Sequence, residues 1–599
     1  MLQRVIPHLE SLKSDEIMDT SARLTRLGLR LFSRSLDTSN GSPRATMDDP
    51  LGLAQASIAL ARAAWANPER VAAAQLDLWW DFATLAQRAA LRLVGAPAEP
   101  VAEPEQGDRR FRHAGWDENP AFDVIKQAYL LTSRAWIDLV KDFEGLDERT
   151  QQKLAFSISQ MADALSPSNF ALTNPEVLQA MADTGGRNLI DGLENLMSDL
   201  ADGNGSLSIK TTDHDAFEVG TNLAVTPGKI VYQNDLMQLI QYAPSTEQVH
   251  RTPLLVMPPW MNKYYIMDLR PGNSVMEWLV GQGHTVFMIS WVNPDERLAD
   301  KGFEDYMLEG PIAALDAIHQ ATGERRVNVT GYCLGGILLS AASAWLQARG
   351  DDRIKSATYL TTMVDFCDTG EVSLFIDEQG LASLESHINE RGFLDGKLVD
   401  VTFRTLRAND LIWSFFVNSY LLGKSPKPFD ILYWNADSTN MPAATHTFFM
   451  RNMYLHNRLR EPGGITLAGV PIDVTRVDTP AYVLSTKEDH IAPWKTGYES
   501  AKLFAGPVTF VLGASGHIAG VVNPPDKQKY GYWSNDCEAL PDDADAWLAD
   551  ASEHVGSWWP HWMRWLEAYA GEAVPARTPG DGRLEPIEDA PGSYVKVRL

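Results

Sequence analysis

Apolar residues in the first third of the chain recur every three or four positions, with polar residues and alanine between them. This period is typical of amphipathic helices, and it extends over 51–95, 121–142 and 175–200. Alternation at every second position, which would indicate a strand, does not occur before about residue 218. The pattern therefore predicts that the first third is mostly helical.

Beyond that point, short apolar runs alternate with helical stretches. The runs cover 253–259, 284–291, 326–333, 356–366, 480–489 and 507–516. Because such runs are apolar on both faces and are separated by helices, they predict a parallel sheet covered by helices on both sides. The fourth and fifth runs are more than 100 residues apart, which is far longer than a usual crossover. We therefore expect an inserted cap between them.

A stretch rich in proline and glutamate separates the first helical region from the next. Residues 95–108 read GAPAEPVAEPEQGD, which is typical of a solvated linker. We predict a variable helical extension with this linker over 1–107, a helical N-terminal domain over 108–225, and a larger α/β domain over 226–599. The cap insertion of the α/β domain is expected at about 367–475.

The composition narrows the class of protein. The chain has 599 residues, of which 45% are hydrophobic and 22% charged, and these ordinary values exclude disorder throughout. Its 52 Lys and Arg against 78 Asp and Glu give a net charge of −26, which argues against a general nucleic-acid binder because phosphate binding needs a basic surface. The 3 cysteines are too few for a disulfide framework, so they indicate a reducing compartment.

Neither a signal peptide nor a membrane span is predicted. The first residues, MLQRVIPHLE, lack the apolar core of a signal peptide, which favours a cytoplasmic location. Residues 327–348 are uncharged and long enough to cross a bilayer, but polar residues and glycines interrupt them. A buried strand that continues into a buried helix explains this segment better. No metal-ligand cluster and no nucleotide-binding fingerprint is visible in the sequence.

The candidate nucleophile lies within that segment. The sequence Gly331-Tyr332-Cys333-Leu334-Gly335 follows a predicted strand and begins a predicted helix, which is the G-x-S-x-G elbow with cysteine in place of serine. Glycines let the strand and helix approach closely around a nucleophile with a strained backbone. The helix N-terminus adds positive potential, which favours a thiolate. The pattern predicts an α/β-hydrolase fold with Cys333 as nucleophile.

In hydrolases with this elbow, the acid and then the histidine follow the nucleophile along the chain. His517 comes directly after the last predicted strand, among small residues, and is the predicted base. Asp365 and Asp489 each end a predicted strand, so both are candidates for the acid. We favour Asp489, since active-site groups gather at the carboxyl ends of such strands and Asp365 leads directly into the expected cap. Asp489 would orient His517, which would deprotonate Cys333.

Two backbone N–H groups are expected to stabilise negative charge on the substrate oxygen. The N–H of Leu334, directly after the nucleophile, is one of them. The second is expected from the loop after the run at 253–259, where Pro258 and Pro259 have no N–H and Trp260 offers the first one. A Pro-Pro turn that only makes the loop rigid explains these residues equally well.

Many short motifs, in a constant order, resemble those of the polyhydroxyalkanoate synthases, bacterial enzymes that form polyesters. They are LSPSNF (165–170), NP (174–175), NLAVTPG (222–228), NKYYI (262–266), GHTVF (283–287), GYCLGG (331–336), YWN (433–435), DSTN (437–440), EDH (488–490), GASGHIAG (513–520) and APGSYVK (590–596). The resemblance extends over roughly 108–599. The length of the chain resembles the class I type, which works without a second subunit.

The resemblance implies an acyltransferase that takes (R)-3-hydroxyacyl groups from coenzyme A and binds them as a thioester on Cys333. A growing polyester then receives them, with Asp489 as activating acid and His517 as base. The coenzyme A thioester is the substrate, and no separate cofactor is implied. The resemblance also implies a homodimer formed through the cap, and a cytoplasmic enzyme at the surface of polyester granules. Trp260 departs from the family, in which a smaller residue is common.

Two other functions share some of these features. A cysteine-variant hydrolase, either a thioesterase or a depolymerase, would use the same triad and release free acid. A non-catalytic coat protein of the granule would need only apolar helices.

Two apolar segments bear on these alternatives. Residues 411–422 form either the core helix of the cap or an exposed face for polymer or dimer contact. Trp558, Trp562 and Trp565 form one stripe of a helix that either packs against the sheet or binds a granule. We favour packing for both segments, and we interpret Cys367 and Cys537 as structural thiols.

Overall fold

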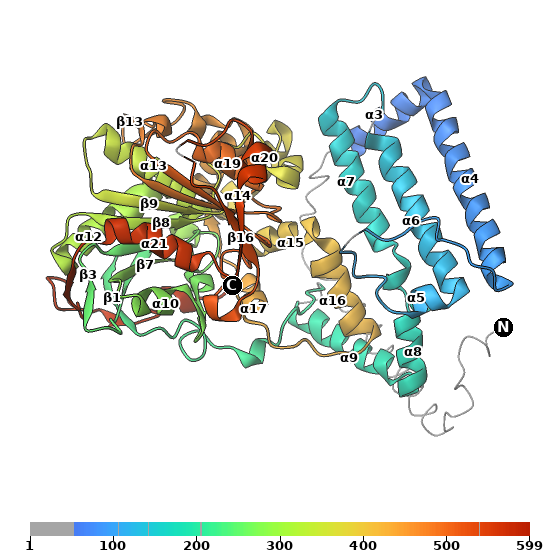
Figure 1. Cartoon of the computed structure of the whole chain (residues 1–599), viewed down its shortest axis with the longest axis horizontal. Coiled ribbons are helices and arrows are strands. Elements are labelled where there is room, and N and C mark those ends of the chain that lie inside the picture. The colour runs from blue at the N-terminus through green and yellow to red at the C-terminus, as the bar shows by residue number, and fades with distance from the viewer. Residues whose placement is uncertain (1–52, 106, 142, 204–206, 538) are drawn as a thin grey trace. The chain divides into compact units, whose positions relative to one another are not determined.

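The computed structural model describes residues 53–105, 107–141, 143–203, 207–537 and 539–599 (Figure 1). These residues fall into two compact units. One contains the described residues up to Asp213 together with Thr402–Lys427, and the other contains His214–Val401 and Pro428–Leu599. The chain therefore enters the second unit twice.

The first unit is mostly helical, as expected. Among its helices are α3 (Leu53–Ala66), α4 (Pro68–Leu93), α5 (Gly115–Glu118), α6 (Pro120–Lys141), α7 (Glu148–Ala164), α8 (Pro175–Thr184) and α9 (Arg187–Asp202). Of these, α5 and α7 lie outside the ranges that the sequence pattern predicts. Gly185 and Gly186 have φ values of 64° and 82°, left-handed conformations that glycine adopts without strain. They divide the helical run at 175–200 in two. Leu85, Trp116 and Phe122 are buried together in the core of this unit.

The apolar segment 411–422 belongs to this helical unit. It continues from α15 (Gly396–Leu406) as a helical stretch made of η9 (Asn409–Trp413), α16 (Ser414–Phe416) and η10 (Val417–Leu421). Tyr420 donates its hydroxyl to Asp199 Oδ2 of α9 at 2.6 Å. Gly192 of α9 is in direct contact, since a Cβ there would lie 1.9 Å from the carbonyl oxygen of Tyr420. Most side chains of the segment are half-buried, so it packs on α9 and is neither a buried core helix nor a fully exposed face.

The second unit contains an eleven-stranded sheet. Six parallel strands form its middle in the order β7 (Val286–Trp291), β4 (Leu254–Met257), β8 (Val327–Tyr332), β9 (Ile354–Leu360), β14 (Ala481–Thr486) and β15 (Val508–Gly513). They coincide with the six apolar runs, so the predicted parallel sheet is confirmed. The segment 327–348 consists of β8 followed by α13 (Leu334–Ala348), as expected. Within the described ranges, no helix is long and apolar enough to cross a membrane.

Antiparallel strands extend the sheet at both edges, and the apolar pattern does not predict them. β2 (Met237–Tyr242), β1 (Gly228–Gln233) and β19 (Glu588–Asp589) follow β7, and β16 (Gly531–Ser534) and β17 (Ser552–Val555) follow β15. β2 is buried along its whole length although it contains Gln238 and Gln241. Gln238 donates its amide to Gln233 Oε1 at 2.8 Å and to Ser593 Oγ at 3.1 Å. These two glutamines thus interrupt the kind of apolar run that identifies the central strands.

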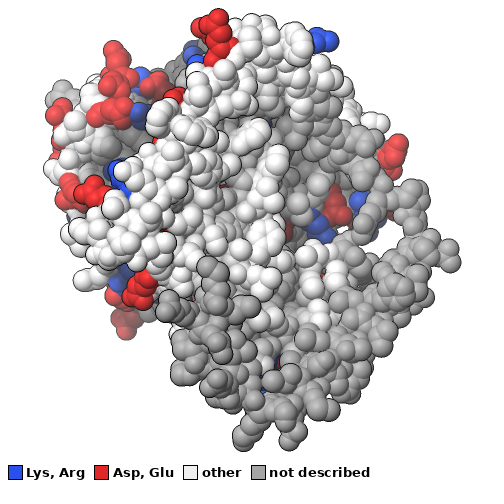
Figure 2. All heavy atoms as spheres, turned by 90° about the vertical axis from the view of Figure 1, so that its right-hand side faces the viewer, with Lys and Arg blue, Asp and Glu red and all other residues white. Residues whose placement is uncertain are grey.

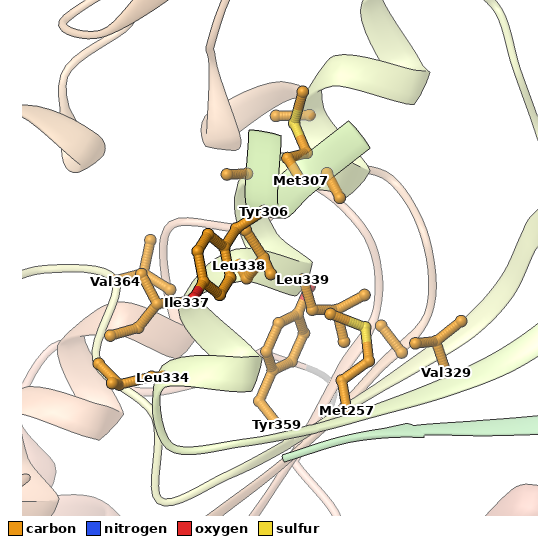
Figure 3. Close-up of a cluster of buried hydrophobic side chains, with 14 of the residues drawn as sticks. Met257, Tyr306, Met307, Val329, Leu334, Ile337, Leu338, Leu339, Tyr359 and Val364 are labelled. Carbon is orange, nitrogen blue, oxygen red and sulfur yellow. The ribbon is translucent and has the colours of Figure 1, made fainter. Parts of the chain in front are cut away.

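Helix α13 provides much of the core on one face of the sheet. Its residues from Leu334 to Leu346 are all buried. Figure 3 shows side chains of this helix beside residues of neighbouring strands, loops and a further helix, α11 (Phe303–Met307): Leu334, Ile337, Leu338 and Leu339 with Met257, Tyr306, Met307, Val329, Tyr359 and Val364. Burial on all sides fixes the position of the helix and of the residue that precedes its N-terminus.

The other face of the sheet is covered by α21 (Trp559–Ala570). Trp558, Trp559 and Trp562 are almost completely buried. The indole N–H groups of the first two donate to the carbonyls of Gly520 and Val521 at 2.9 Å. The expected packing of the tryptophan stripe against the sheet is therefore confirmed, and it also holds the chain that follows β15.

The cap is expected in the region between β9 and β14. The helices of this region in the second unit are α14 (Glu378–Arg391), the first part of α15, α17 (Asp430–Ala436) and α18 (Ala443–Phe449), whereas Thr402–Lys427 belongs to the helical unit. The remaining α-helices of the second unit are α10 (Val275–Gly281), α11 (Phe303–Met307), α12 (Ala313–Thr322), α19 (Trp494–Ala501) and α20 (Ala544–Asp550).

Candidate active site

Cys333 lies at the sharp turn between β8 and α13. Its φ of 52° and ψ of −118° are strained for a residue with a side chain, a conformation that persists where the surroundings fix it. A Cβ at Gly331 would lie 2.5 Å from the Cα of Gly336, and a Cβ at Gly335 would lie 2.1 Å from the carbonyl oxygen of Met257. Only glycine therefore fits at these two positions, as a nucleophile elbow requires.

Asp489 and His517 lie together at the carboxyl ends of β14 and β15. His517 Nδ1 and Asp489 Oδ2 are 2.7 Å apart, and their side chains are 7% and 0% exposed. The second carboxylate oxygen of Asp489, Oδ1, accepts the N–H groups of Ile491 and Ala492, both at 2.9 Å. Both oxygens of the carboxylate are thus occupied, so its orientation toward the imidazole is fixed.

The electrostatics of His517 link it to both predicted partners. Burial disfavours the protonated ring, but the negative charges and hydrogen bonds of Asp489 and Cys333 outweigh burial and raise the pKa of His517 well above its ordinary value. The ring is therefore a strong proton acceptor for the neighbouring thiol. The arrangement can carry out nucleophilic catalysis through a thiolate paired with an imidazolium.

Asp365, the other candidate acid, is used elsewhere. It accepts hydrogen bonds from Asn457 Nδ2 at 2.7 Å, from Arg460 Nη1 at 2.8 Å and from the backbone N–H of Cys367 at 3.0 Å. These contacts join the end of the strand after the nucleophile to the cap. The structure therefore brings Asp489, and not Asp365, to His517.

The remaining two cysteines are not part of this constellation. Cys367 is exposed, and burial of its sulfur, together with the negative charge of Asp365, raises the pKa of its thiol. Cys537 is half-buried and packs against the core of the sheet. Both stay predicted structural thiols. In the part of the chain that the structure describes, no three His, Cys, Asp or Glu side chains are grouped so as to hold a metal ion.

The two predicted oxyanion donors lie in adjoining segments. Leu334 begins α13, and the contact of Gly335 with the carbonyl oxygen of Met257 brings this helix against the loop that contains Trp260. Among the described residues, no acceptor takes the N–H of Leu334 or of Trp260. The Trp260 ring is 2% exposed and packs between Tyr306 and other aromatic rings. Both N–H groups are thus available for a substrate oxygen.

Two tyrosines that the sequence pattern does not indicate lie close to these groups. Tyr332 donates its hydroxyl to the carbonyl of His517 at 3.3 Å, and the two rings are 5.5 Å apart. Burial raises the pKa of Tyr332 and of Tyr454, and the charges of Cys333 and Asp489 raise both further. Both hydroxyls therefore stay protonated. Tyr332 adjoins the nucleophile in sequence, whereas nothing in the sequence around Tyr454 signals its place.

The parallel sheet, the strained elbow and the His–Asp pair define the chain as a member of the α/β-hydrolase class. Residues 245–524 match the family described as alpha/beta hydrolase fold. Residues 107–279 match the family described as Poly-beta-hydroxybutyrate polymerase (PhaC) N-terminus.

Several relatives are similar over most of the chain. The chain is 49% identical to Poly(3-hydroxyalkanoate) polymerase of Methylorubrum extorquens, over 89% of this chain and 88% of that one. It is 49% identical to the polymerase subunit PhaC of Rhizobium meliloti (89% and 86%) and 45% identical to that of Cupriavidus necator (82% and 83%). The chain belongs to the poly(3-hydroxyalkanoate) polymerase family.

Proposed function

We propose that this chain is a poly(3-hydroxyalkanoate) polymerase that transfers (R)-3-hydroxyacyl groups from coenzyme A to a growing polyester. The relatives named above support this function. The single observation that carries the chemistry is a thiol on a nucleophile elbow beside a buried His–Asp pair. The resemblance to the class I synthases supports a single chain that works without a second subunit.

The reaction begins with formation of a thioester on the protein. His517 takes the proton of Cys333 while Asp489 holds the imidazole, and the thiolate attacks the carbonyl carbon of the substrate thioester. The N–H groups of Leu334 and Trp260 stabilise the negative charge on the carbonyl oxygen. The C–S bond to coenzyme A then breaks, and the leaving thiolate receives the proton from His517. One thioester replaces another, so the acyl group stays activated.

Chain growth follows when a hydroxyl group attacks that thioester. His517 removes the hydroxyl proton, an ester bond forms, and Cys333 leaves as thiolate and takes up the proton again. A hydrolase would complete the same cycle with water as the attacking group. The rival function, a cysteine-variant thioesterase or depolymerase, therefore differs only in the acceptor.

The products of the purified enzyme distinguish these acceptors. With (R)-3-hydroxybutyryl-CoA as substrate, we expect insoluble polyester to form in step with release of the coenzyme A thiol. Free 3-hydroxybutyrate, measured in the soluble fraction, should account for little of the released acyl group. Free acid without polymer would contradict the polymerase function and support a hydrolase.

We further propose that the enzyme contacts the polyester granule through the outer side of α4. Several large apolar side chains of this helix are exposed, among them Trp79 at 60% and Trp80 at 63%. Figure 2 views the side where α4 lies in Figure 1, and the described residues that it shows there are mostly uncharged. An uncharged polyester surface suits exposed apolar side chains because their burial against it removes apolar area from water.

Replacing Trp79 and Trp80 with serine should weaken association with polyester granules. Burial of two indole rings contributes enough that we expect the partition coefficient to fall by about tenfold or more. Co-sedimentation with preformed granules measures the partition, and the rate of coenzyme A release from soluble enzyme should stay the same. Trp136→Ser on α6 is the matched control, since Trp136 is 55% exposed but lies on another helix. Equal partition of wild type and double variant would contradict this role of α4.

The homodimer through the cap stays a proposal that the resemblance supports. Sedimentation velocity of the purified chain measures the mass directly. If the chain sediments as a monomer at concentrations where the enzyme is active, the proposed homodimer is wrong.

A further inference from the structure

The loop that carries Trp260 has few internal means of keeping its shape. Pro258 and Pro259 lack the N–H groups that usually close a turn. The N–H of Trp260 itself donates to no acceptor among the described residues. An oxyanion donor must nevertheless lie about 3 Å from the substrate oxygen to be effective. The place of this N–H group therefore depends on contacts that come from outside the loop.

The Trp291 indole supplies one of them, since it donates to the carbonyl of Pro258 at 2.9 Å. The contacts that reach Trp260 and the residues after it come largely from one short segment, the DSTN motif at 437–440. Three successive pairs join it to the loop: Trp260 with Thr439, Asn262 with Ser438, and Lys263 with Asp437. The first pair is a hydrogen bond of 3.2 Å from a hydroxyl to a main-chain carbonyl, the second is an antiparallel backbone bridge, and the third is an ion pair of 2.7 Å. The two segments thus run antiparallel and are joined at three points.

The ion pair is buried, with 2% of the Lys263 side chain and 1% of the Asp437 side chain exposed. Further bonds restrain both partners. Tyr265 donates its hydroxyl to Asp437 Oδ2 at 2.9 Å, and the Trp434 indole donates to the carbonyl of Lys263 at 2.6 Å. Burial lowers the pKa of Lys263, and the charge of Asp437 opposes this shift. A buried ion pair tolerates little displacement because separating the two charges leaves each of them unpaired in the interior, so it fixes the register between loop and motif.

The motif is itself attached to the sheet. The last residue of the motif, Asn440, receives a hydrogen bond from the N–H of Gly396 at 3.1 Å and donates its amide to the carbonyl of Pro294 at 3.1 Å. Its backbone N–H donates to Asn293 Oδ1 at 3.0 Å. Asn293 and Pro294 come directly after the central strand β7. The motif can therefore act as a rigid brace for the loop.

We propose that residues 437–439 are a positioning element that holds the Trp260 N–H beside the Leu334 N–H, so that both donors meet the same substrate oxygen. The inference rests on the acyl transfer proposed above. None of the motif's side chains takes part in a chemical step of that reaction. Its effect on the reaction passes through the carbonyl and backbone of the loop.

The Thr439–Trp260 bond offers the most direct test. Thr439 is 3% exposed, and Thr439→Val has nearly the same shape but lacks the hydroxyl donor. We expect kcat for coenzyme A release to fall about tenfold or more, because small displacements of catalytic groups have effects of this size, with KM changed less than about twofold. Thr439→Ser, which keeps the donor, should restore most of kcat.

A second reaction of the same thiol separates positioning from damage to the fold or triad. Alkylation of Cys333 by iodoacetamide displaces iodide and forms no oxyanion, so it needs the thiolate but not the N–H of Trp260. Cys333 of the Thr439→Val variant should therefore be alkylated at the wild-type rate, although acyl transfer by this variant is slow. If both rates fall together, or if kcat stays at the wild-type value, the positioning role is wrong.

The ion pair is tested by Lys263→Met and by the double variant Lys263→Met/Asp437→Leu. Both should slow acyl transfer more than alkylation, and the double variant should be no slower than the single one, since the two groups act as a unit. Asp430→Asn is the matched control: the Asp430 side chain is 1% exposed and pairs with Arg270 Nε at 2.7 Å. The ratio of the two rates should stay at the wild-type value in this control.

The outcomes also separate this inference from the function on which it rests. Wild-type enzyme that releases no coenzyme A, or that forms free acid only, would contradict the polymerase function. The positioning element alone would be contradicted by a different result. In that case the wild type makes polymer, but the ratio of acyl-transfer rate to alkylation rate in Thr439→Val and Lys263→Met equals the wild-type ratio.

Discussion

Replacing Cys333 with alanine should reduce coenzyme A release and polymer formation by several orders of magnitude. The thiol is the only group of the proposed mechanism that forms a covalent bond to the acyl group, and loss of one member of such a unit removes nearly all of its contribution. A colorimetric thiol assay with (R)-3-hydroxybutyryl-CoA measures the release, and turbidity measures the polymer. The melting temperature should change little, because the alanine Cβ occupies the same place on the elbow.

The other thiols supply the control for this variant. Cys367→Ala removes an exposed cysteine of the same chain and should leave the rate of release unchanged. Cys333→Ser should be much slower than wild type, since a hydroxyl needs stronger assistance from His517 than a thiol does. Polymer formation that survives in Cys333→Ala would end the assignment of the nucleophile and would favour the non-catalytic coat function.

The central sheet could be predicted from sequence because its strands are buried on both faces. β4, β8 and β14 consist largely of apolar residues, so a short apolar run reports them directly. The edge strands could not be predicted in this way. β17 is mostly exposed, and β2 is buried but carries Gln238 and Gln241, whose polarity hides the strand. Only the tertiary partners of these residues explain their place.

The elbow and the His517–Asp489 pair could be predicted for a different reason. The elbow glycines and the turn after β15 are local signals, and the order of nucleophile, acid and base follows from the order of the strands. The choice between Asp365 and Asp489 depended on their places at strand ends and on the argument that Asp365 leads into the cap. In the structure Asp365 contacts Arg460, which lies 95 residues further along the chain. No local pattern indicates a partner at that distance.

The contacts between the DSTN motif and the loop of Trp260 could not be predicted from the sequence either, because the partners are far apart in the chain. Thr439 and Trp260 are 179 residues apart in the chain. The motif was visible in the sequence as a likeness to a family, but its contacts were not. The motif and the loop pair with each other only because the folded chain brings the residues after β4 next to the cap.

Replacing Asp489 with asparagine should lower kcat for coenzyme A release by about 10³–10⁴-fold. The size of this effect follows from the two backbone N–H groups of Ile491 and Ala492, which donate to Oδ1 of the aspartate. In the variant these N–H groups need the amide oxygen as acceptor, so the amide NH₂ must face His517. The NH₂ group then donates to Nδ1, and the ring proton moves to Nε2, the nitrogen that should accept the proton of Cys333.

The pH dependence of alkylation checks this explanation against a general loss of structure. Without the charge of Asp489, the imidazolium is less stable and its pKa falls, so iodoacetamide should inactivate Asp489→Asn more slowly than wild type near neutral pH. The difference in inactivation rate should narrow as the pH rises and the thiol ionises without help.

Asp365→Asn is the matched control, because this aspartate is also buried but accepts hydrogen bonds from Asn457 and Arg460. It should lose stability and keep both its kcat and its alkylation profile. A greater loss of kcat in Asp365→Asn than in Asp489→Asn would reverse the assignment of the acid.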